Sequence, residues 1–159
     1  MTTQQLLTIQ PGSLPPDGIT LYGEVPCSDL DIPNEDRISA PNPLRFRLHV
    51  SLAGGVLVQG QARTVLRCRC DRCLTYFDHP LDLDRVCHFY KDMECDEIDL
   101  TEDIREDILL AFPQQSLCRP DCRGLCSNCG CNLNVRDCGC RGAPEPGRAW
   151  DVLDALDLR

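Results

Sequence analysis

Apolar and polar residues alternate most regularly in the middle of the chain. In LRFRLHVSLA, residues 44–53, an apolar side chain occupies every second position, with arginine, histidine and serine between. A period of two residues is typical of a β-strand that buries one face. Gly54 and Gly55 follow, and they predict a two-residue hairpin turn. The next segment, VLVQGQARTVLRC at residues 56–68, is then a second strand that runs back beside the first. Gly60 within it is a candidate bulge position. The pattern predicts an antiparallel sheet with one face toward water.

Weaker strand signals flank this hairpin. YFDHPLDLDRVCHFYKD, residues 76–92, alternates over a shorter stretch, and Pro80 favours an edge position for its start. Seven prolines among the first 43 residues restrict that region to short strands, of which ITLYGEV at 19–25 and QLLTIQ at 5–10 are the candidates.

The period then changes to that of a helix. DLTEDIREDILLAFP, residues 99–113, aligns apolar residues on one stripe, and Pro113 ends the pattern, so we predict an amphipathic helix over 99–112. Asp99 and Glu102 match a capping box in which Asp replaces Ser or Thr. The acidic residues of this helix are expected to form mostly a solvated face, with a basic protein partner as the alternative.

The predicted elements combine into an α+β fold: a small antiparallel β-sheet or partial barrel with one amphipathic helix. Residues 1–113 form the β-rich domain, and residues 114–159 form a Cys-rich, zinc-binding segment packed on it. Within that segment, GAPEPG at 142–147 is a turn-rich linker, and RAWDVLDALDL at 148–158 is a short terminal helix.

The cysteine content changes the picture, because 13 of the 159 residues are cysteine. The N-terminal sequence has no basic residue and no apolar run of signal-peptide length, and no segment is apolar enough to cross a bilayer. We therefore expect a cytoplasmic protein without a membrane partner. In that reducing compartment, clustered cysteines are more often metal ligands than disulfides.

Eight cysteines have the spacing of zinc ligands. Two C-x2-C pairs each bring two sulfur atoms to one metal, and two more closely spaced pairs complete the set: Cys70 with Cys73, Cys126 with Cys129, Cys118 with Cys122, and Cys138 with Cys140. The last four cysteines of the set lie within fifteen residues and close most easily on themselves, so we predict that Cys126, Cys129, Cys138 and Cys140 share one ion. The first pair then meets Cys118 and Cys122. In the alternative partition, the two C-x2-C pairs share a site, and a single zinc ion is also conceivable.

The other five cysteines are expected to be small apolar residues, although Cys68 and Cys131 lie close enough to act as substitute ligands. A thioredoxin-like redox role would need a helix starting at the first cysteine of a C-x2-C pair, and none follows Cys70. The three histidines have no triad-like spacing, and there is no phosphate-binding glycine motif. We therefore expect a protein that is not an enzyme, with no catalytic residue and no small-molecule substrate.

Charge is distributed unevenly along the chain. Residues 78–107 carry twelve acidic and three basic residues, whereas both cysteine-bearing regions are locally basic, and 15 of the 16 basic residues are arginine. Arginine binds phosphates in a bidentate manner and stacks on bases. Seven arginines are candidate nucleic-acid contacts: Arg67, Arg69, Arg72, Arg119, Arg123, Arg136 and Arg141.

These motifs, in this order, resemble the YceD family, the large ribosomal RNA subunit accumulation proteins. The resemblance rests on LRCRCDRCL, then DLTEDIREDILLAFP, then LCRPDCRGLCSNCGCNLN followed by CGC and a short Trp-bearing helix, and it covers roughly residues 44–157. It implies a cytoplasmic bacterial protein, or an organelle relative, needed for synthesis, processing or stability of large-subunit (23S) ribosomal RNA. Family members differ in how many C-terminal cysteines they keep, which implies that the first metal site is the shared one.

Three functions follow as hypotheses. The first is a non-enzymatic ribosome-biogenesis factor whose zinc sites stiffen a basic surface that contacts ribosomal RNA or a large-subunit ribosomal protein. The second is an interaction adaptor whose acidic segment imitates nucleic acid or binds a basic protein. The third is a redox-sensing zinc protein that releases its metal when its thiolates are oxidised.

Overall fold

The computed structural model describes residues 7–91 and 96–140. The described chain forms, in order, β1 (Thr8–Ile9), the 3-10 turn η1 (Pro11–Ser13), β2 (Ile19–Val25), the 3-10 turn η2 (Cys27–Leu30), β3 (Ile38–Ser39), β4 (Leu44–Leu52), β5 (Val56–Arg69), β6 (Tyr76–Tyr90), β7 (Ile98–Asp99) and α2 (Thr101–Leu110). The predicted terminal helix at 148–158 lies outside the described residues.

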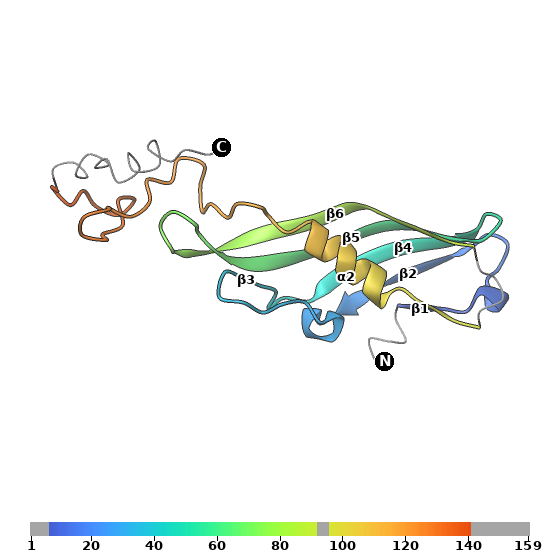
Figure 1. The fold of residues 1–159 in the computed structure, drawn as a ribbon. Helices are drawn as coiled ribbons and strands as arrows, with labels where there is room; N and C mark the ends of the chain where they lie inside the picture. The colour runs from blue at the N-terminus through green and yellow to red at the C-terminus, as the bar shows by residue number, and fades with distance from the viewer. Residues whose placement is uncertain (1–6, 92–95, 141–159) are drawn as a thin grey trace, which may run out of the picture.

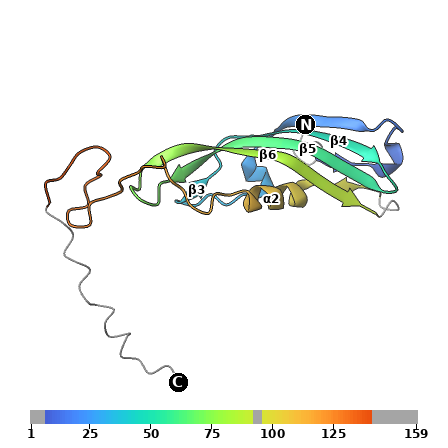
Figure 2. The same ribbon diagram turned by 90° about the horizontal axis from the view of Figure 1, so that it is seen from above.

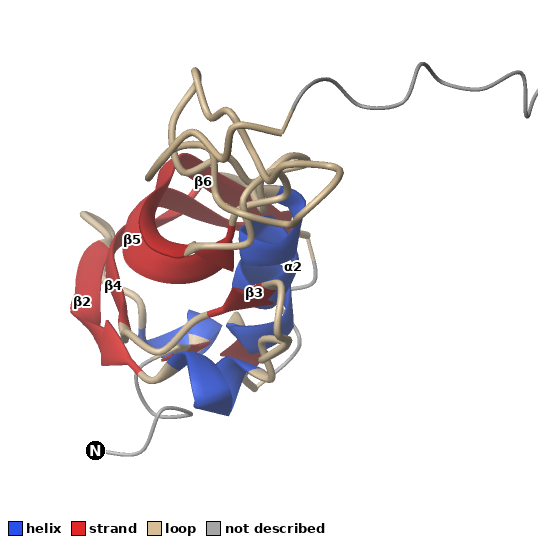
Figure 3. Cartoon of the chain, turned by 90° about the vertical axis from the view of Figure 1, so that its left-hand side faces the viewer, coloured by secondary structure: helices blue, strands red, loops and turns tan. Residues whose placement is uncertain are grey.

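The main sheet is antiparallel and is built around the long strand β5. One edge of β5 pairs with β4 and, further along, with β3, while its other edge pairs with β6; β2 lies outside β4. Seen from one end, the sheet curls into a half-barrel, and α2 lies along its open side (Figure 3). The view from above places α2 against one face of the sheet only (Figure 2). The predicted sheet with one wet face, and the edge position of β6, are confirmed.

The core lies between the concave face of the sheet and α2. Every second residue of β4 from Leu44 to Val50 is buried, as the alternation predicted, whereas Leu52 at the end of the strand is exposed. Leu100, Ile104 and Ile108 of the helical stripe are fully buried against the same cluster. Burying a leucine or isoleucine side chain contributes about 2 kcal/mol relative to leaving it exposed. This shared core fixes α2 on the sheet.

The predicted two-residue turn is wrong, whereas the predicted bulge position at Gly60 is confirmed. The β4–β5 loop has three residues, because Leu52 pairs with Val56, and Gly54 adopts a left-handed φ of 72°. The bulge lies at Gly60, but the extra residue belongs to β6, where Asp84 and Arg85 both face outward opposite one residue of β5. Leu52 and Val56 are the last paired residues of the two strands, and three residues lie between them, so the turn cannot be a two-residue turn.

The predicted capping box is wrong. Leu100 is the N-cap residue and makes no side-chain cap, while Asp99 accepts hydrogen bonds from the Thr101 backbone at 2.9 Å and from its hydroxyl. Asp99 still belongs to β7, which pairs with β1, and Glu102 reaches toward Arg105 instead of back along the chain. The pairing of β7 therefore moves the helix start two residues beyond the predicted one.

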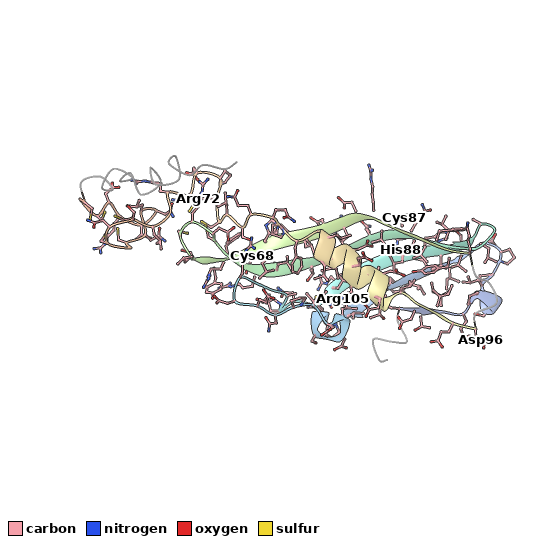
Figure 4. The ribbon with its side chains drawn as sticks, viewed as in Figure 1. Cys68, Arg72, Cys87, His88, Asp96 and Arg105 are labelled. Atoms are coloured by element: carbon pink, nitrogen blue, oxygen red, sulfur yellow. The ribbon has the colours of Figure 1, made fainter. Side chains whose placement is uncertain are left out.

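The acidic face of α2 is also less solvated than predicted. Asp107 binds His88 Nε2 at 2.8 Å, and Asp103 accepts a hydrogen bond from the Tyr90 hydroxyl, so both carboxylates join the helix to β6. Figure 4 labels His88 on the sheet beside α2. Burial and the neighbouring Asp103 carboxylate raise the pKa of Tyr90 above its ordinary value, which keeps this hydroxyl a donor. His88 therefore has a structural partner in Asp107.

Beyond the hairpin formed by β5 and β6, residues 114–140 extend past the end of the sheet (Figure 1). This segment has no regular helix or strand and contributes no large buried aliphatic side chain to the core. Something other than apolar burial must hold it in place. Within the described residues, no helix is both long and apolar enough to cross a membrane.

Candidate metal centres

The first centre joins the end of the sheet to the segment after α2. Cys70 and Cys73 lie in the turn between β5 and β6, and Cys118 and Cys122 approach them from the coil that follows the helix. The Cys70 and Cys122 sulfurs are 3.7 Å apart, the Cys73 and Cys118 sulfurs are 3.6 Å apart, and all four lie within 4.8 Å of one another. Tetrahedral zinc with bonds of about 2.3 Å needs sulfurs about 3.8 Å apart. The spacing fits zinc without movement of the chain.

The second centre is local and more exposed. Cys126, Cys129, Cys138 and Cys140 bring their sulfurs within 4.8 Å of one another, and all four are partly or fully exposed. The two groups coincide with the partition that the spacing favoured and not with the alternative. All cysteines in the described residues are free thiols. The ligand role of these eight residues and the identity of the metal stay predictions.

Both C-x2-C pairs adopt the same turn. The residue after the second cysteine has a left-handed φ, 59° at Leu74 and 71° at Gly130, and its backbone N–H donates to the carbonyl of the first cysteine at 2.9 Å and 2.8 Å. Glycine adopts this conformation without a steric penalty, whereas the Cβ atom of a leucine makes it unfavourable. Leu74 therefore stores strain that Gly130 does not.

The pKa values of the first group show that its thiols do not all lose their protons equally easily. Burial raises the pKa of Cys70, but backbone N–H groups of Cys118, Cys73 and Arg72 outweigh it and bring that pKa to about 6. Burial and the neighbouring thiols raise the pKa of Cys118 to about 12. Four thiolates this close cannot all be ionised alone, so a divalent cation is the chemical complement of this site.

The second group shows the same division. Backbone N–H groups lower the pKa of Cys129 and of Cys138. Hydrogen bonds that the Cys140 thiol donates to the Cys138 and Cys129 sulfurs raise the pKa of Cys140 to about 12. Soft thiolate ligands select zinc or copper(I) over hard cations, so both donor sets fit zinc.

Polar contacts that the sequence did not predict hold the first centre in place. Asp71 and Ser116 exchange hydrogen bonds, 2.8 Å from the Asp71 backbone N–H to the Ser116 carbonyl and 2.7 Å from the Ser116 N–H to the Asp71 carboxylate. Asn134 Nδ2 donates to the Cys122 sulfur at 3.2 Å, and its amide oxygen accepts from the Arg123 backbone N–H at 2.8 Å. Asn134 lies between the cysteines of the second centre in sequence and therefore couples the two centres. Its only sequence signal is the CNLN segment.

The two candidate substitute ligands differ. Cys68 is fully buried in the core of the sheet, lies at the end of β5 in Figure 4, and is outside the first group. Cys131 lies close to the second group, with its thiol in hydrogen-bonding reach of Cys129 and Cys138. Of the remaining cysteines, Cys27 is buried, Cys87 is exposed on β6, and Cys95 lies outside the described residues.

Most of the predicted nucleic-acid arginines have intramolecular partners. Arg67 pairs with Asp78 at 3.1 Å, Arg69 pairs with Asp36, and Arg123 pairs with Asp137 at 2.5 Å. Other members are held as well: Arg72 donates to the Cys122 carbonyl at 3.1 Å, and Arg119 donates to Asn134 at 2.7 Å. Arg72 lies beyond the end of the sheet (Figure 4). Arg136 has no such partner in the described residues, and Arg141 lies outside them. The arginines near the metal centres thus contribute to the local structure.

Comparison with known proteins finds one matching protein family and several similar proteins. Residues 90–157 match the family "Large ribosomal RNA subunit accumulation protein YceD". The chain is 33% identical over 79 residues to the chloroplastic YCED homolog 1 of Arabidopsis thaliana, covering 50% of this chain and 24% of that protein. It is 37% identical over 70 residues to the maize YCED homolog 1, covering 43% and 23%.

A bacterial relative aligns over a longer stretch. An uncharacterized protein of Mycobacterium tuberculosis is 31% identical over 119 residues, 65% of this chain and 53% of that protein. The chain thus spans about a quarter of the plant relatives and about half of the mycobacterial one. No solved structure matches the chain. The predicted resemblance to the YceD family is confirmed.

Proposed function

Because residues 90–157 carry the YceD family match, we propose that this protein supports the accumulation of large-subunit (23S) ribosomal RNA as a non-enzymatic ribosome-biogenesis factor. It would contact ribosomal RNA, a large-subunit ribosomal protein, or both. The plant relatives carry the ribosomal RNA role in their names, and that role comes to this chain only as part of the proposal. We further propose that it acts in the cytoplasm.

The observation that carries the proposal is the closed geometry of the first centre. Cys70, Cys73 and Cys122 are 5% exposed or less and Cys118 is partly buried, and the four sulfur atoms lie within 4.8 Å of one another, around a space sized for one tetrahedral ion. Four protein thiolates leave no coordination position for water or substrate, so such an ion stabilises a fold instead of catalysing a reaction. The same argument makes a binding role more fitting than an enzymatic one.

Zinc would be held by Cys70, Cys73, Cys118 and Cys122 in the first centre and by Cys126, Cys129, Cys138 and Cys140 in the second. When bound, it supplies a cross-link that apolar burial does not provide in this segment. The chain itself supplies the orienting contacts: Asp71 and Ser116 fix the turn that carries the first two ligands, and Asn134 donates to a ligand sulfur. Outer contacts of this kind orient metal ligands and tune their basicity.

Genetic complementation tests the proposal. In a strain lacking the protein, we expect the ratio of large-subunit to small-subunit ribosomal RNA to fall, and the wild-type chain to restore it. Cys70→Ser should fail to restore the ratio, whereas Cys87→Ser, which removes an exposed cysteine outside both groups, should restore it fully. An unchanged RNA ratio in the deletion strain would refute the proposed function.

A further inference from the structure

The convex face of the sheet is uncovered in the described part of the chain, and two neighbouring rows of side chains cross it. Cross-strand pairing aligns Glu24, Arg45, Arg63 and Asp82 in one row. Two residues further along the strands, it aligns Tyr22, Arg47 and Gln61, with Arg85 of the β6 bulge beyond them. Each row therefore runs across β2, β4, β5 and β6.

The first row neutralises itself. Arg45 Nε lies 2.9 Å from Glu24, and Arg63 Nε lies 3.2 Å from Asp82. Each arginine already has a carboxylate partner, so an incoming phosphate would have to displace that partner first. This row is the natural internal control for its neighbour.

The arginines of the second row have no such partner, although Arg63 of the first row also reaches across, donating a hydrogen bond to Gln61 Oε1 at 3.3 Å and lying 3.7 Å from Asp84 of the bulge. Within the described residues, Arg47 and Arg85 make no ion pair. In the same part of the chain, Tyr22 makes no hydrogen bond or ring contact, and 77% of this residue is exposed. An aromatic ring this exposed is free to stack on a flat ligand. Guanidinium groups without a carboxylate partner, here on both sides of Gln61, can bind an anion.

A polar groove adjoins this row. It has a volume of about 500 Å³ and is lined by Thr20, Arg47, His49, Gln59, Gly60, Gln61 and Asp84. No aliphatic side chain lines it, so it does not suit the apolar core of a protein interface. Amide, imidazole and hydroxyl groups both donate and accept hydrogen bonds, which is what the edge of an unpaired base requires.

The backbone around the groove is fixed. A Cβ atom at Gly60 would lie 2.1 Å from the Arg47 carbonyl oxygen, so only glycine allows β4 and β5 to approach this closely. A Cβ atom at Gly18 would lie 3.2 Å from the His49 ring, which therefore packs against that glycine. The row and the groove are held on paired strands and not on loops.

We propose that the face formed by Tyr22, Arg47, Gln61 and Arg85, with the groove beside it, binds a single-stranded segment of RNA. The Tyr22 ring would stack on a base, Arg47 and Arg85 would bind phosphates, and the glutamine side chains would contact a base edge. This inference rests on the proposed function and moves the RNA contact away from the arginines of the metal centres.

The test uses fluorescence anisotropy of a short single-stranded large-subunit ribosomal RNA fragment with the full, zinc-loaded chain. Tyr22→Ala should weaken binding roughly tenfold, because stacking on an aromatic side chain contributes that much per base, while Tyr22→Phe should keep most of the affinity. Arg47→Gln should weaken binding and reduce the salt dependence by about one phosphate contact. The matched control Arg45→Gln should change affinity by less than about twofold, since Glu24 already occupies that arginine.

Three results would overturn the inference. If Tyr22→Ala and Arg47→Gln bind like the wild type while Arg136→Gln binds less, RNA contacts the metal-centre segment instead, and the proposed function stands. Preference for duplex over single-stranded RNA would remove the stacking role of Tyr22. Capture of a large-subunit ribosomal protein without any RNA binding would make this face, at most, a protein contact. The complementation experiment, by contrast, tests the proposed function without reference to this face.

Discussion

The two candidate metal centres share one type of turn and consist of four cysteines each, but their structural roles differ. The first joins cysteines that are 45 and 52 residues apart in sequence, and three of its four ligands are buried. The second closes within fifteen residues, and its ligands are partly or fully exposed. The first centre therefore holds two parts of the molecule together, whereas the second gives shape to a single loop.

Loop length alone does not explain this difference. Cross-linking a loop about four times longer adds only about 1.2 kcal/mol, since each doubling adds roughly 0.6 kcal/mol. The larger contrast comes from what each centre packs against. The first lies beside the Asp71 and Ser116 contacts and the end of the sheet, while the second touches the remainder mainly through the segment that contains Asn132 and Asn134.

The largest expected effect follows loss of a ligand from the first centre. We expect Cys70→Ser to lose one zinc ion and to free the 114–140 segment from the sheet, because metal binding and folding are coupled in such sites. Hydrogen exchange should rise throughout this segment and at the end of the β5–β6 hairpin. In the matched variant Cys126→Ser, one zinc ion is also lost, but exchange should rise only within 126–140. Equal exchange patterns in the two variants would contradict the comparison.

Lowering the pH should release zinc from the two centres one after the other. Zinc requires thiolates, so its affinity falls as the pH falls and protons compete for the sulfurs. The exposed second centre should release its ion at a higher pH than the buried first centre, because water reaches its ligands more easily. A chromophoric zinc chelator followed during a pH titration should report two separate release steps. Release of both ions in a single step would argue against independent centres.

A smaller effect should distinguish the two turns. Leu74→Gly should stabilise the zinc-loaded protein by up to about 1 kcal/mol, because it relieves a left-handed leucine that is half exposed and loses little packing. Gly130→Ala should instead destabilise the second turn by about 1 kcal/mol. Chemical unfolding of both variants in the presence of zinc checks the sign of each change. Destabilisation by Leu74→Gly would mean that the leucine side chain contributes more than its strain costs.

The smallest effect is expected at Cys131. Cys131→Ser should leave the zinc content unchanged, because the four ligands of the second centre already satisfy a tetrahedral ion. Because the Cys131 thiol lies close to the second group, it can replace a missing ligand. Cys140→Ser should therefore keep part of its zinc, and the Cys131→Ser, Cys140→Ser double variant should lose it. Mass spectrometry of the intact protein in its zinc-bound state measures both. Loss of zinc from Cys131→Ser alone would place this residue in the ligand set.

The sequence predicted the parts of this structure that have a period or a short spacing. The strands β4 and β5 follow from alternation along 44–68, and the second centre follows from cysteines that cannot lie far apart. The first centre could be paired only by elimination, since nothing local in Cys118 or Cys122 indicates which strand end they meet. The structure groups these cysteines as predicted, because Cys118 and Cys122 were the pair left over once the second group had been assigned.

The remaining features depend on contacts between distant polar residues, which leave no periodic signal. Asp71 and Ser116 are 45 residues apart, and the Asn134 contact with a ligand sulfur requires the folded loop. The capping box failed for a related reason, because pairing of β7 with β1 kept Asp99 in a strand. Arginine clusters likewise predicted charge but not pairing, and the carboxylates that neutralise Arg67 and Arg69 come from other strands and loops.

Zinc stoichiometry in paired variants tests the central claim most directly. Intact-protein mass spectrometry should show one zinc ion lost from Cys70→Ser, and no further loss when Cys118→Ser is added, because both residues serve the same ion. Adding Cys126→Ser to Cys70→Ser should remove the second ion. Loss of only one ion in the Cys70→Ser, Cys126→Ser double variant would show that the two C-x2-C pairs share a site, and it would contradict the division into a sheet-joining centre and a loop-closing centre.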